Sequence, residues 1–490
     1  MEELVGRERE ITVLESLTKS NKAELLAIYG RRRIGKTFLI SKFFSSKGIY
    51  FEMTGIKGGK CKQQIRVFIR RLQLVFKDVS IETPPNTWFE AFEILETAIQ
   101  STRKTCKIIL FFDEFPWMDT HKSDLLKAFE YLWNSYLSKD PRIITIVCGS
   151  SASWMVRKII QNKAGLYGRL TSQIRLRPFT LREIEKYCVA NRIPLDRKQI
   201  VEVSMALGGV PKYLSYIEPG MSAAQIIQKL CFTPGAPLTT EFQALYESLF
   251  DNYHLHVEII ELLARSTIGL TVSQISEKLR KEKGGTISRV LKELIASNFV
   301  QFFPFYGRKT REGRYRVVDE YSYFYLNWVQ GSMYNYDESI SQSFWIKQQS
   351  SSKYRSWVGY VFESVCLKHV RQIIKALELT VVAEKASYWS YFPKNSPESG
   401  GQIDLIIDRA DQCINLCEIK FWNSEYIMND ANAQKLNKRR EIFREKAKTK
   451  KTLFNTLITP YGARVNKHYL SSVDKQLNLD ALFLDDVQIP

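Results

Sequence analysis

Residues 30–37 read GRRRIGKT, which matches the pattern G-x-x-x-x-G-K-[ST]. The apolar run at 25–29 before this segment favours a buried strand, and residues 37–44 after it favour a helix. Because loop N–H groups at a helix N-terminus attract anions, the segment predicts a phosphate-binding loop of a nucleotide site. The residues expected to surround the phosphates are Gly30, Arg31, Arg32, Arg33, Ile34, Gly35, Lys36 and Thr37.

Chemical roles follow for individual residues of this site. Lys36 is expected to reach the β- and γ-phosphates of ATP, and the Thr37 hydroxyl to bind Mg²⁺. Residues 108–114 read IILFFDE, an apolar strand that ends in two acids. Asp113 is expected to hold Mg²⁺, and Glu114 to polarise the attacking water as the catalytic base. Together the two segments predict a Mg²⁺-dependent ATPase.

Two further residues are candidates for the same site. The apolar run at 143–148 is followed by a glycine and two serines, and Ser150 is placed to sense the γ-phosphate; a serine-rich turn is the alternative. Arg169 follows at 165–169, GLYGR, where an arginine can stabilise charge on a transferred phosphoryl group. It would act within its own chain or on a neighbouring copy in a nucleotide-dependent homo-oligomer. A surface arginine is the alternative.

The composition limits the class of protein. The chain has 490 residues and a net charge of +19, which favours association with polyanions such as DNA. No apolar run is long enough to span a membrane, and residues 1–11 do not resemble a signal peptide. Eight cysteines occur without a C-x-x-C pair, which argues against a structural zinc site or a disulfide framework. These features predict a cytoplasmic protein without a membrane partner.

The pattern of elements predicts five segments. Residues 1–180 alternate strand and helix, as in an α/β fold with a parallel sheet, and residues 181–253 favour a helical lid. Residues 254–318 favour three helices and a hairpin, a winged helix-turn-helix with 286–296 as its recognition helix. A purely structural winged helix is the alternative. Residues 319–352 form an expected helical connector that ends in a serine linker, and 353–490 a C-terminal domain.

Several motifs occur in an order that resembles one known family. Residues 1 to about 330 are similar to the archaeal-type ATPases, which are related to AAA+ proteins and to the STAND nucleotide switches. The resemblance implies that Val5, Gly6 and Arg7 lie near the adenine and that Pro211 lies in a lid near the nucleotide. The motifs are VGREREI at 5–11, the loop at 29–37, FFDEF at 111–115, CGSS at 148–151, GLYGR at 165–169, LRPF at 176–179 and GGVPKYL at 208–214.

A second candidate site lies near the C-terminus. Residues 400–407 and 414–420 favour a hairpin that brings Asp404 beside Glu418 and Lys420, which share one strand face. Glu363, on an expected amphipathic helix at 357–370, is available to complete the cluster. Asp404 and Glu418 are expected to bind Mg²⁺ or Mn²⁺, and Lys420 to orient or activate water.

This acid, acid-x-Lys arrangement resembles the PD-(D/E)xK nucleases, although Ile403 replaces their usual proline. The resemblance implies a restriction-endonuclease-like α/β domain that cuts DNA. Folds of this class also occur as DNA binders that do not cut. The basic helix at 432–451 could follow a phosphate backbone, or be a solvated helix face.

Two hypotheses about function follow. In the first, an AAA+-type ATPase controls a metal-dependent DNA nuclease domain, with defence or mobile-element DNA processing as settings by analogy. In the second, the chain is a STAND-like nucleotide switch that binds DNA or a protein partner. The C-terminal nuclease-like domain then serves for recognition and does not cut. A processive helicase is disfavoured, because no second motor module is evident.

Overall fold

The computed structural model describes residues 4–77, 81, 83–102, 106–161, 166, 168–250, 252–281, 285–307, 311–332, 343–391 and 400–485. It divides into two compact units. The first comprises Met1–Pro178 with Ser248–Asp251 and Ala296–Asn298, and the second contains the rest of the chain.

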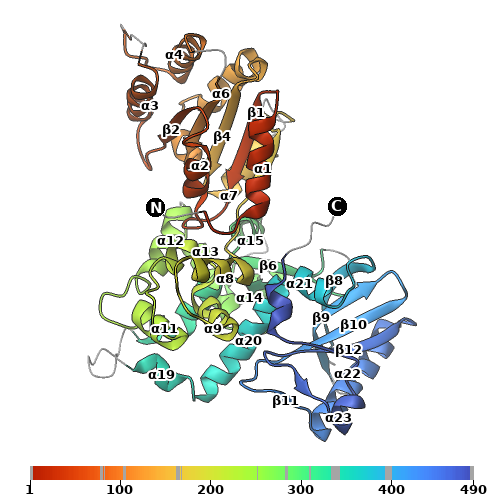
Figure 1. Cartoon of the computed structure of the whole chain (residues 1–490). Coiled ribbons are helices and arrows are strands. Elements are labelled where there is room, and N and C mark those ends of the chain that lie inside the picture. The colour runs from red at the N-terminus through yellow and green to blue at the C-terminus, as the bar shows by residue number, and fades with distance from the viewer. Residues whose placement is uncertain are drawn as a thin grey trace. The chain divides into compact units, whose positions relative to one another are not determined.

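A parallel five-stranded sheet forms the centre of the first unit (Figure 1). Its strand order is β2-β3-β4-β1-β5, and every neighbouring pair is parallel. The central strands β3 and β4 are buried at every residue, as their uninterrupted apolar sequences require. The expected α/β fold with a parallel sheet is therefore confirmed. The strands are β1 (Glu24–Tyr29), β2 (Ile49–Thr54), β3 (Ile108–Asp113), β4 (Ile143–Gly149) and β5 (Ser172–Arg175).

Helices cover both faces of this sheet. On one face α1 and α2 pack against residues such as Ile28 and Phe111. On the other, α3, α4 and α6 pack against their alternate neighbours, including Ala27 and Phe112, in a core rich in aromatic rings. The helical segments of the unit are α1 (Glu8–Lys19), α2 (Lys36–Phe44), α3 (Cys61–Val75), α4 (Trp88–Gln100), α5 (Phe115–Met118), α6 (Leu125–Ser135), η1 (Leu137–Lys139), α7 (Ala152–Met155) and η2 (Val156–Ile160).

The second unit begins with helices. Thr180 caps α8 as expected, because its side chain accepts a hydrogen bond from the N–H of Glu183. The expected break at Gly208 and Gly209 separates α9 from α10, and Phe179 N–H donates to the Gly209 carbonyl at 2.6 Å. The helices are α8 (Leu181–Ala190), α9 (Arg197–Leu207), α10 (Pro211–Leu214), α11 (Ala223–Cys231) and α12 (Glu241–Leu249).

Three helices and an antiparallel hairpin follow, at the positions that the sequence indicates. Thr271 caps the second helix. The elements are α13 (His254–Ala264), α14 (Val272–Lys278), α15 (Gly285–Ala296), β6 (Val300–Pro304) and β7 (Gly313–Val317). The segment between the two strands is rich in lysine and arginine, and its residues 308–310 lie outside the described residues.

The serine run at 350–352 is not the expected linker. Ser351 is the N-cap of α20, and its hydroxyl accepts a hydrogen bond from the Tyr354 N–H at 3.0 Å. The following helix is buried at most positions rather than amphipathic, because it packs within the unit on several sides. The helical segments here are α16 (Glu320–Phe324), the π-helical η3 (Tyr325–Val329), α17 (Gln330–Ser332), α19 (Phe344–Gln348), α20 (Ser352–Lys368) and α21 (Val370–Ala376).

A mixed five-stranded sheet with the order β14-β12-β10-β9-β8 ends the chain. The strands β8, β9 and β10 are antiparallel, whereas β12 runs parallel to β10 and is reached through α22. Beside it, β11 and β13 form a small parallel pair. The elements are β8 (Ala383–Tyr391), β9 (Gly401–Arg409), β10 (Cys413–Ile419), β11 (Tyr426–Ile427), α22 (Asp430–Ala447), β12 (Thr452–Ile458), β13 (Ala463–Arg464), α23 (Lys467–Leu470), β14 (Lys475–Leu477) and η4 (Leu479–Phe483).

Candidate functional sites

The loop at 30–37 connects β1 to α2 and is shaped by backbone conformations that favour glycine. Gly30 has φ +150°, and a Cβ there would lie 2.3 Å from the Leu176 carbonyl oxygen. Gly35 has φ +86° and precedes the helix directly. Arg33 also adopts a positive φ of 70°, which is uncommon for a residue with a side chain. The loop therefore follows the tight course of a phosphate-binding turn at a helix N-terminus.

Lys36 is the central cation of this loop. Its ammonium donates hydrogen bonds to the carbonyl oxygens of Gly30 and Arg31, each at 2.9 Å, and only 6% of the residue is exposed. The charge is therefore held inside the loop by two carbonyl oxygens, and the Asp113 carboxylate is close enough to interact with it electrostatically. A buried cation whose hydrogen bonds go to carbonyl dipoles favours an anionic ligand.

Thr37 and Asp113 meet at the edge of the sheet. The Thr37 hydroxyl donates to Asp113 Oδ2 at 2.9 Å. Burial raises the pKa of Asp113 above its ordinary value, and the Cys148 thiol and the Thr37 hydroxyl offset this only in part. A hydroxyl beside a carboxylate is a donor set that suits Mg²⁺, and both residues lie where the sequence places them.

Glu114 and Ser150 form a second pair next to these residues. Glu114 Oε2 accepts hydrogen bonds from the Ser150 hydroxyl at 2.7 Å and from its N–H at 3.0 Å. Glu114 has φ 45°, so the chain turns sharply where β3 ends. The predicted catalytic base is thus oriented by the predicted sensor residue.

The remaining predicted residues of this site differ in their surroundings. Arg7 is buried and donates to the carbonyl oxygens of Ile34 at 3.2 Å and Arg177 at 2.8 Å, so it supports the phosphate loop from behind. Arg32 lies over the Trp117 ring. Arg169 is exposed in a turn.

Three more residues were predicted to lie near the nucleotide. Val5 is half-buried and Gly6 buried, directly before Arg7. Pro211 is the first residue of α10 in the second unit, so its expected place near the nucleotide stays a prediction.

The C-terminal sheet brings together the acids predicted for the second site. Asp404 on β9 accepts a hydrogen bond from the Ile419 N–H at 3.0 Å, beside Glu418 on β10. Lys420 lies 2.9 Å from Glu418 Oε1. Burial and then the Glu363 and Glu418 carboxylates raise the pKa of the half-buried Asp404 well above its ordinary value.

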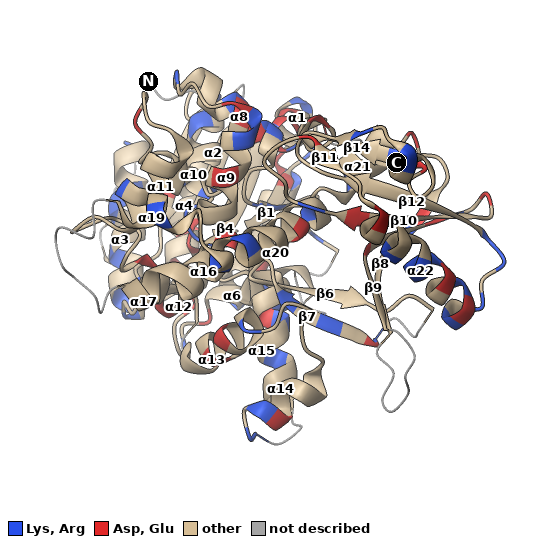
Figure 2. Ribbon diagram, turned by 90° about the horizontal axis from the view of Figure 1, so that it is seen from below, with Lys and Arg blue, Asp and Glu red and all other residues tan. Residues whose placement is uncertain are grey.

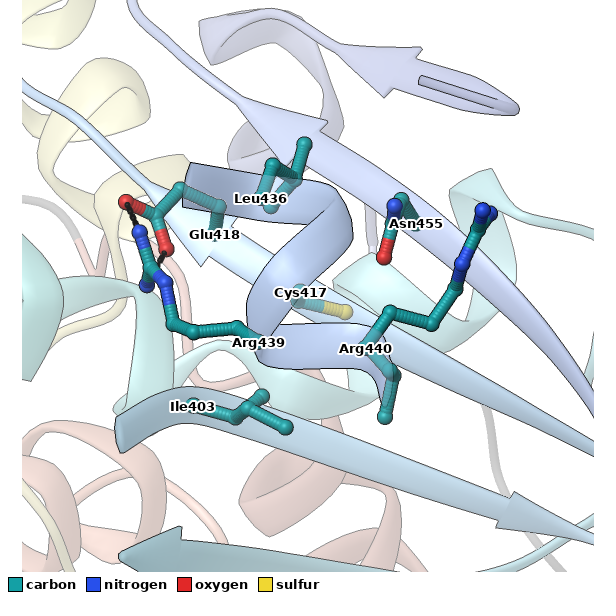
Figure 3. A pocket seen from close by; sticks show the side chains of 8 residues that line it. Ile403, Cys417, Glu418, Leu436, Arg439, Arg440 and Asn455 are labelled. Carbon is teal, nitrogen blue, oxygen red and sulfur yellow. Dashed lines mark hydrogen bonds and ion pairs between the residues drawn. The ribbon is translucent and has the colours of Figure 1, made fainter. Parts of the chain in front are cut away.

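Arg439 on α22 joins this cluster. Its guanidinium bonds to both oxygens of Glu418 (Figure 3). It also donates to the Gln402 carbonyl at 3.2 Å. Burial alone would raise the pKa of Glu418, but Lys420 and Arg439 together lower it. Arg439 was not among the residues predicted from the sequence. A signal existed, since Leu436, Arg439 and Phe443 recur at helical spacing and two of them are buried apolar residues.

Glu363 on α20 has a different partner. Its Oε1 lies 2.5 Å from Nη1 of Arg316 in the β6–β7 hairpin, and the Glu363 and Arg316 side chains are 12% and 2% exposed. Arg316 also lies over the Tyr360 ring. Arg316 of the hairpin therefore points inward and neutralises the third acid of the predicted cluster.

These ion pairs affect metal binding. Among the described residues, no group of three or more His, Cys, Asp or Glu side chains is arranged to hold a metal ion. The carboxylate chemistry suits a divalent cation, but the arrangement does not, because Arg439 occupies both oxygens of Glu418.

Acidic side chains also engage several cations of the basic helix. Figure 2 shows both charge signs along α22. Arg440 and Arg444 lie 3.7 and 3.9 Å from Glu441, and Lys446 lies 2.9 Å from Glu445. The helix α22 therefore carries acidic as well as basic side chains, which agrees with a solvated helix face as well as with contact to a phosphate backbone.

Known proteins similar to this chain agree with an ATPase site around the loop at 30–37. Residues 4–217 match a family described as an ATPase domain predominantly from Archaea. An uncharacterized protein of Methanocaldococcus jannaschii is 25% identical over 445 residues, 90% of this chain and 91% of that protein. An uncharacterized ATP-binding protein of the same organism is 51% identical over 45 residues, 9% of this chain and 76% of that protein.

Two solved structures are also similar. The Walker-type ATPase paby2304 of Pyrococcus abyssi has a TM-score of 0.47 at 18% identity, covering 66% of this chain and 96% of that one. The Aeropyrum pernix ORC2 protein in its ADPNP–ADP complexes has a TM-score of 0.40 at 14% identity, covering 68% and 96%. Within the part of the chain that the structure describes, no helix is long and apolar enough to cross a membrane.

Proposed function

We propose that this chain, which carries an archaeal-type ATPase domain over residues 4–217, uses ATP binding and hydrolysis to control a metal-dependent DNA nuclease domain at 353–490. The observation that carries the first half is the convergence of Lys36, Thr37 and Asp113 on one loop, with Glu114 held beside them. The second half rests on the convergence of Asp404, Glu418 and Lys420.

In the ATPase site, each side chain has one task. Lys36 would exchange its carbonyl acceptors for phosphate oxygens, and Thr37 and Asp113 would hold Mg²⁺, which would offset the negative charge of the phosphates. Glu114 accepts a proton from the attacking water. Ser150 orients the Glu114 carboxylate, because the Ser150 N–H and hydroxyl both donate hydrogen bonds to Glu114 Oε2. Arg169 is exposed and available to a neighbouring copy, so we include nucleotide-dependent assembly in the proposal.

The topology of the C-terminal sheet supports a nuclease of the PD-(D/E)xK class. A helix, three antiparallel strands, a helix and a parallel strand follow one another as α20, β8, β9, β10, α22 and β12. Asp404 and Glu418 would hold Mg²⁺ or Mn²⁺, which would polarise a phosphodiester. Lys420 would then orient the attacking water.

Two arginines that pair with the acids of this site would control its access to a metal ion. Arg439 holds Glu418 and Arg316 holds Glu363, so the described arrangement is closed to a metal ion. Cutting requires Arg439 to leave Glu418, for example when a DNA phosphate competes for its guanidinium. The hairpin with Arg316 belongs to the proposed winged helix at 254–318. DNA bound to that winged helix could therefore also release Arg316 from Glu363 and so affect the cluster of Asp404, Glu418 and Lys420, which we call the acid site.

The same observation favours a second candidate function. If the ion pairs persist, the C-terminal domain recognises DNA without cutting it, and the chain is a STAND-like switch. The salt bridges on both glutamates are the specific reason to retain this candidate.

One experiment separates the two. Purified protein is incubated with plasmid, linear and branched DNA and Mn²⁺, with and without ATP. We expect cleavage that Asp404→Asn and Lys420→Ala abolish while ATP hydrolysis persists. Asp408→Asn is the matched control, because Asp408 lies on the same strand but pairs with Lys451. Cleavage by wild type that both site variants retain would overturn the site assignment, and ATP-sensitive binding without any cleavage would establish the switch.

A further inference from the structure

The loops after β10 and β12 lie at one edge of the C-terminal sheet. The two strands run parallel and end together, since Ile419 pairs with Ile458 and the Lys420 N–H donates to the Ile458 carbonyl at 2.9 Å. Beyond them, the Tyr426 N–H donates to the Gly462 carbonyl at 3.0 Å. Residues 420–425 and 459–462 are therefore neighbouring loops, and Lys420 of the acid site begins one of them.

Each loop carries an exposed aromatic side chain. Trp422 is 52% exposed and Tyr461 48% exposed. Trp422 packs edge-on against the ring of Tyr426, with 5.9 Å between ring centroids, so it is supported on one side. An exposed aromatic residue with a fixed neighbour loses little entropy when a ligand stacks on it.

The small sheet β11–β13 follows directly on these two loops. Its inward pair, Tyr426 and Ala463, is buried in a local apolar cluster. Its outward pair is Ile427, 59% exposed, opposite the exposed Arg464, and Val465 follows at 60%. One face of this sheet is thus complete, and the other is open.

We define the aromatic rim as Trp422, Ile427, Tyr461, Arg464 and Val465. Clustering of this kind marks an interaction surface, because scattered exposed apolar residues need no partner but grouped ones do. The rim also carries charge: Arg464 lies within it, Lys467 follows on α23, and Lys420 adjoins Trp422 at a distance of two residues. Glu425 is the exposed acid of the same loop.

We propose that the aromatic rim binds the unpaired nucleotides of single-stranded DNA. Exposed Trp and Tyr side chains flanked by Lys and Arg are the chemistry that stacks bases and follows the phosphate backbone. A protein partner would also cover apolar residues, but it would not bring a phosphodiester to Lys420. The inference deepens the proposed function, since it names the substrate class of the acid site: branched or flapped DNA with a single-stranded arm.

The test measures binding rather than cutting. A short single strand containing 2-aminopurine is titrated with the full chain in chelator, without ATP, and base stacking is followed by fluorescence quenching. We expect Trp422→Leu and Tyr461→Leu each to weaken binding about tenfold, the loss typical of one stacked base. Trp422→Phe should restore most of the affinity, because it keeps a ring. Glu425→Gln should strengthen binding slightly, because it removes a repelling charge.

Controls make the outcomes decisive. Tyr131→Leu removes an equally exposed aromatic residue, 60% exposed, from the first unit and should leave binding unchanged. Thermal unfolding of each variant confirms that the chain folds. Wild-type affinity in Trp422→Leu, or equal affinity of wild type for duplex DNA, would overturn the proposal. Because no metal is present, loss of stacking and absence of nuclease activity are independent results.

Discussion

The buried pair between Arg316 and Glu363 allows a quantitative test of how the β6–β7 hairpin is joined to α20. Its side chains are 2% and 12% exposed and lie 2.5 Å apart. Removing one partner of such a pair leaves an uncompensated charge and costs about 3–5 kcal/mol, whereas replacing both by apolar residues is often near neutral. We therefore predict that Arg316→Leu and Glu363→Leu are each strongly destabilising and that the double variant costs about 2–4 kcal/mol less than the sum of the two.

The free energies of unfolding are compared in a double-mutant cycle. Urea unfolding of the full chain is followed by hydrogen exchange in peptides covering 300–317 and 352–368, which reports this part of the second unit even if the two units unfold separately. We expect a coupling free energy of about 2–4 kcal/mol between the two positions.

An exposed ion pair in the same unit supplies the control. Lys281 and Glu258 lie 2.6 Å apart but are 42% and 45% exposed. Solvent screens such a pair, so its coupling should be about 0.2–1 kcal/mol. The reasoning is refuted if the buried pair gives a coupling no larger than this control, because burial would then contribute nothing.

Three further predictions concern the ATPase site. Lys36→Ala should abolish binding of a fluorescent ATP analogue, because it removes the ammonium that lies inside the loop on the Gly30 and Arg31 carbonyls; undiminished binding would exclude the site. Ser150→Ala should lower phosphate release by about tenfold with analogue binding unchanged, because Glu114 loses one of two donors and catalysis by a base depends on its position. Equal rates would show that Ser150 does not orient Glu114. Gly30→Ala should destabilise the first unit by about 1–3 kcal/mol in thermal unfolding, because its Cβ would meet the Leu176 oxygen. Gly58→Ala, at φ +70° but with open space around it, should cost less; equal losses would contradict the steric argument.

The elements that could be predicted are those with strong local signals. Strands β1, β3 and β4 were expected because central parallel strands are uninterrupted apolar runs. The edge strand β5, with the sequence SQIR, was missed because it is short and only partly buried. The serine run was misinterpreted as a linker, since a capping serine and a linker serine look alike until the helix is seen.

In the candidate sites, too, the residues with short local spacing could be predicted from the sequence, whereas those that depend on distant elements could not. Gly30–Thr37, the pair Asp113–Glu114 and the pair Glu418–Lys420 were found because their geometry follows from short spacing along one strand or turn. Ser150 was predicted to lie in the site, but its hydrogen bond to Glu114 was not, since this bond depends on how the ends of β3 and β4 lie side by side. Arg439 was missed, because its basic helix suggested a solvent-facing role.

The sequence by itself determined which side chains can do chemistry in this protein, because a loop, a strand end or an alternating strand presents its residues at distances set by local covalent geometry. Only the tertiary structure decided which charges are satisfied. Arg439 reaches Glu418 across 21 residues and Arg316 reaches Glu363 across 47. Such pairings depend on how distant elements pack, since a buried charge requires a partner but no sequence pattern specifies which one.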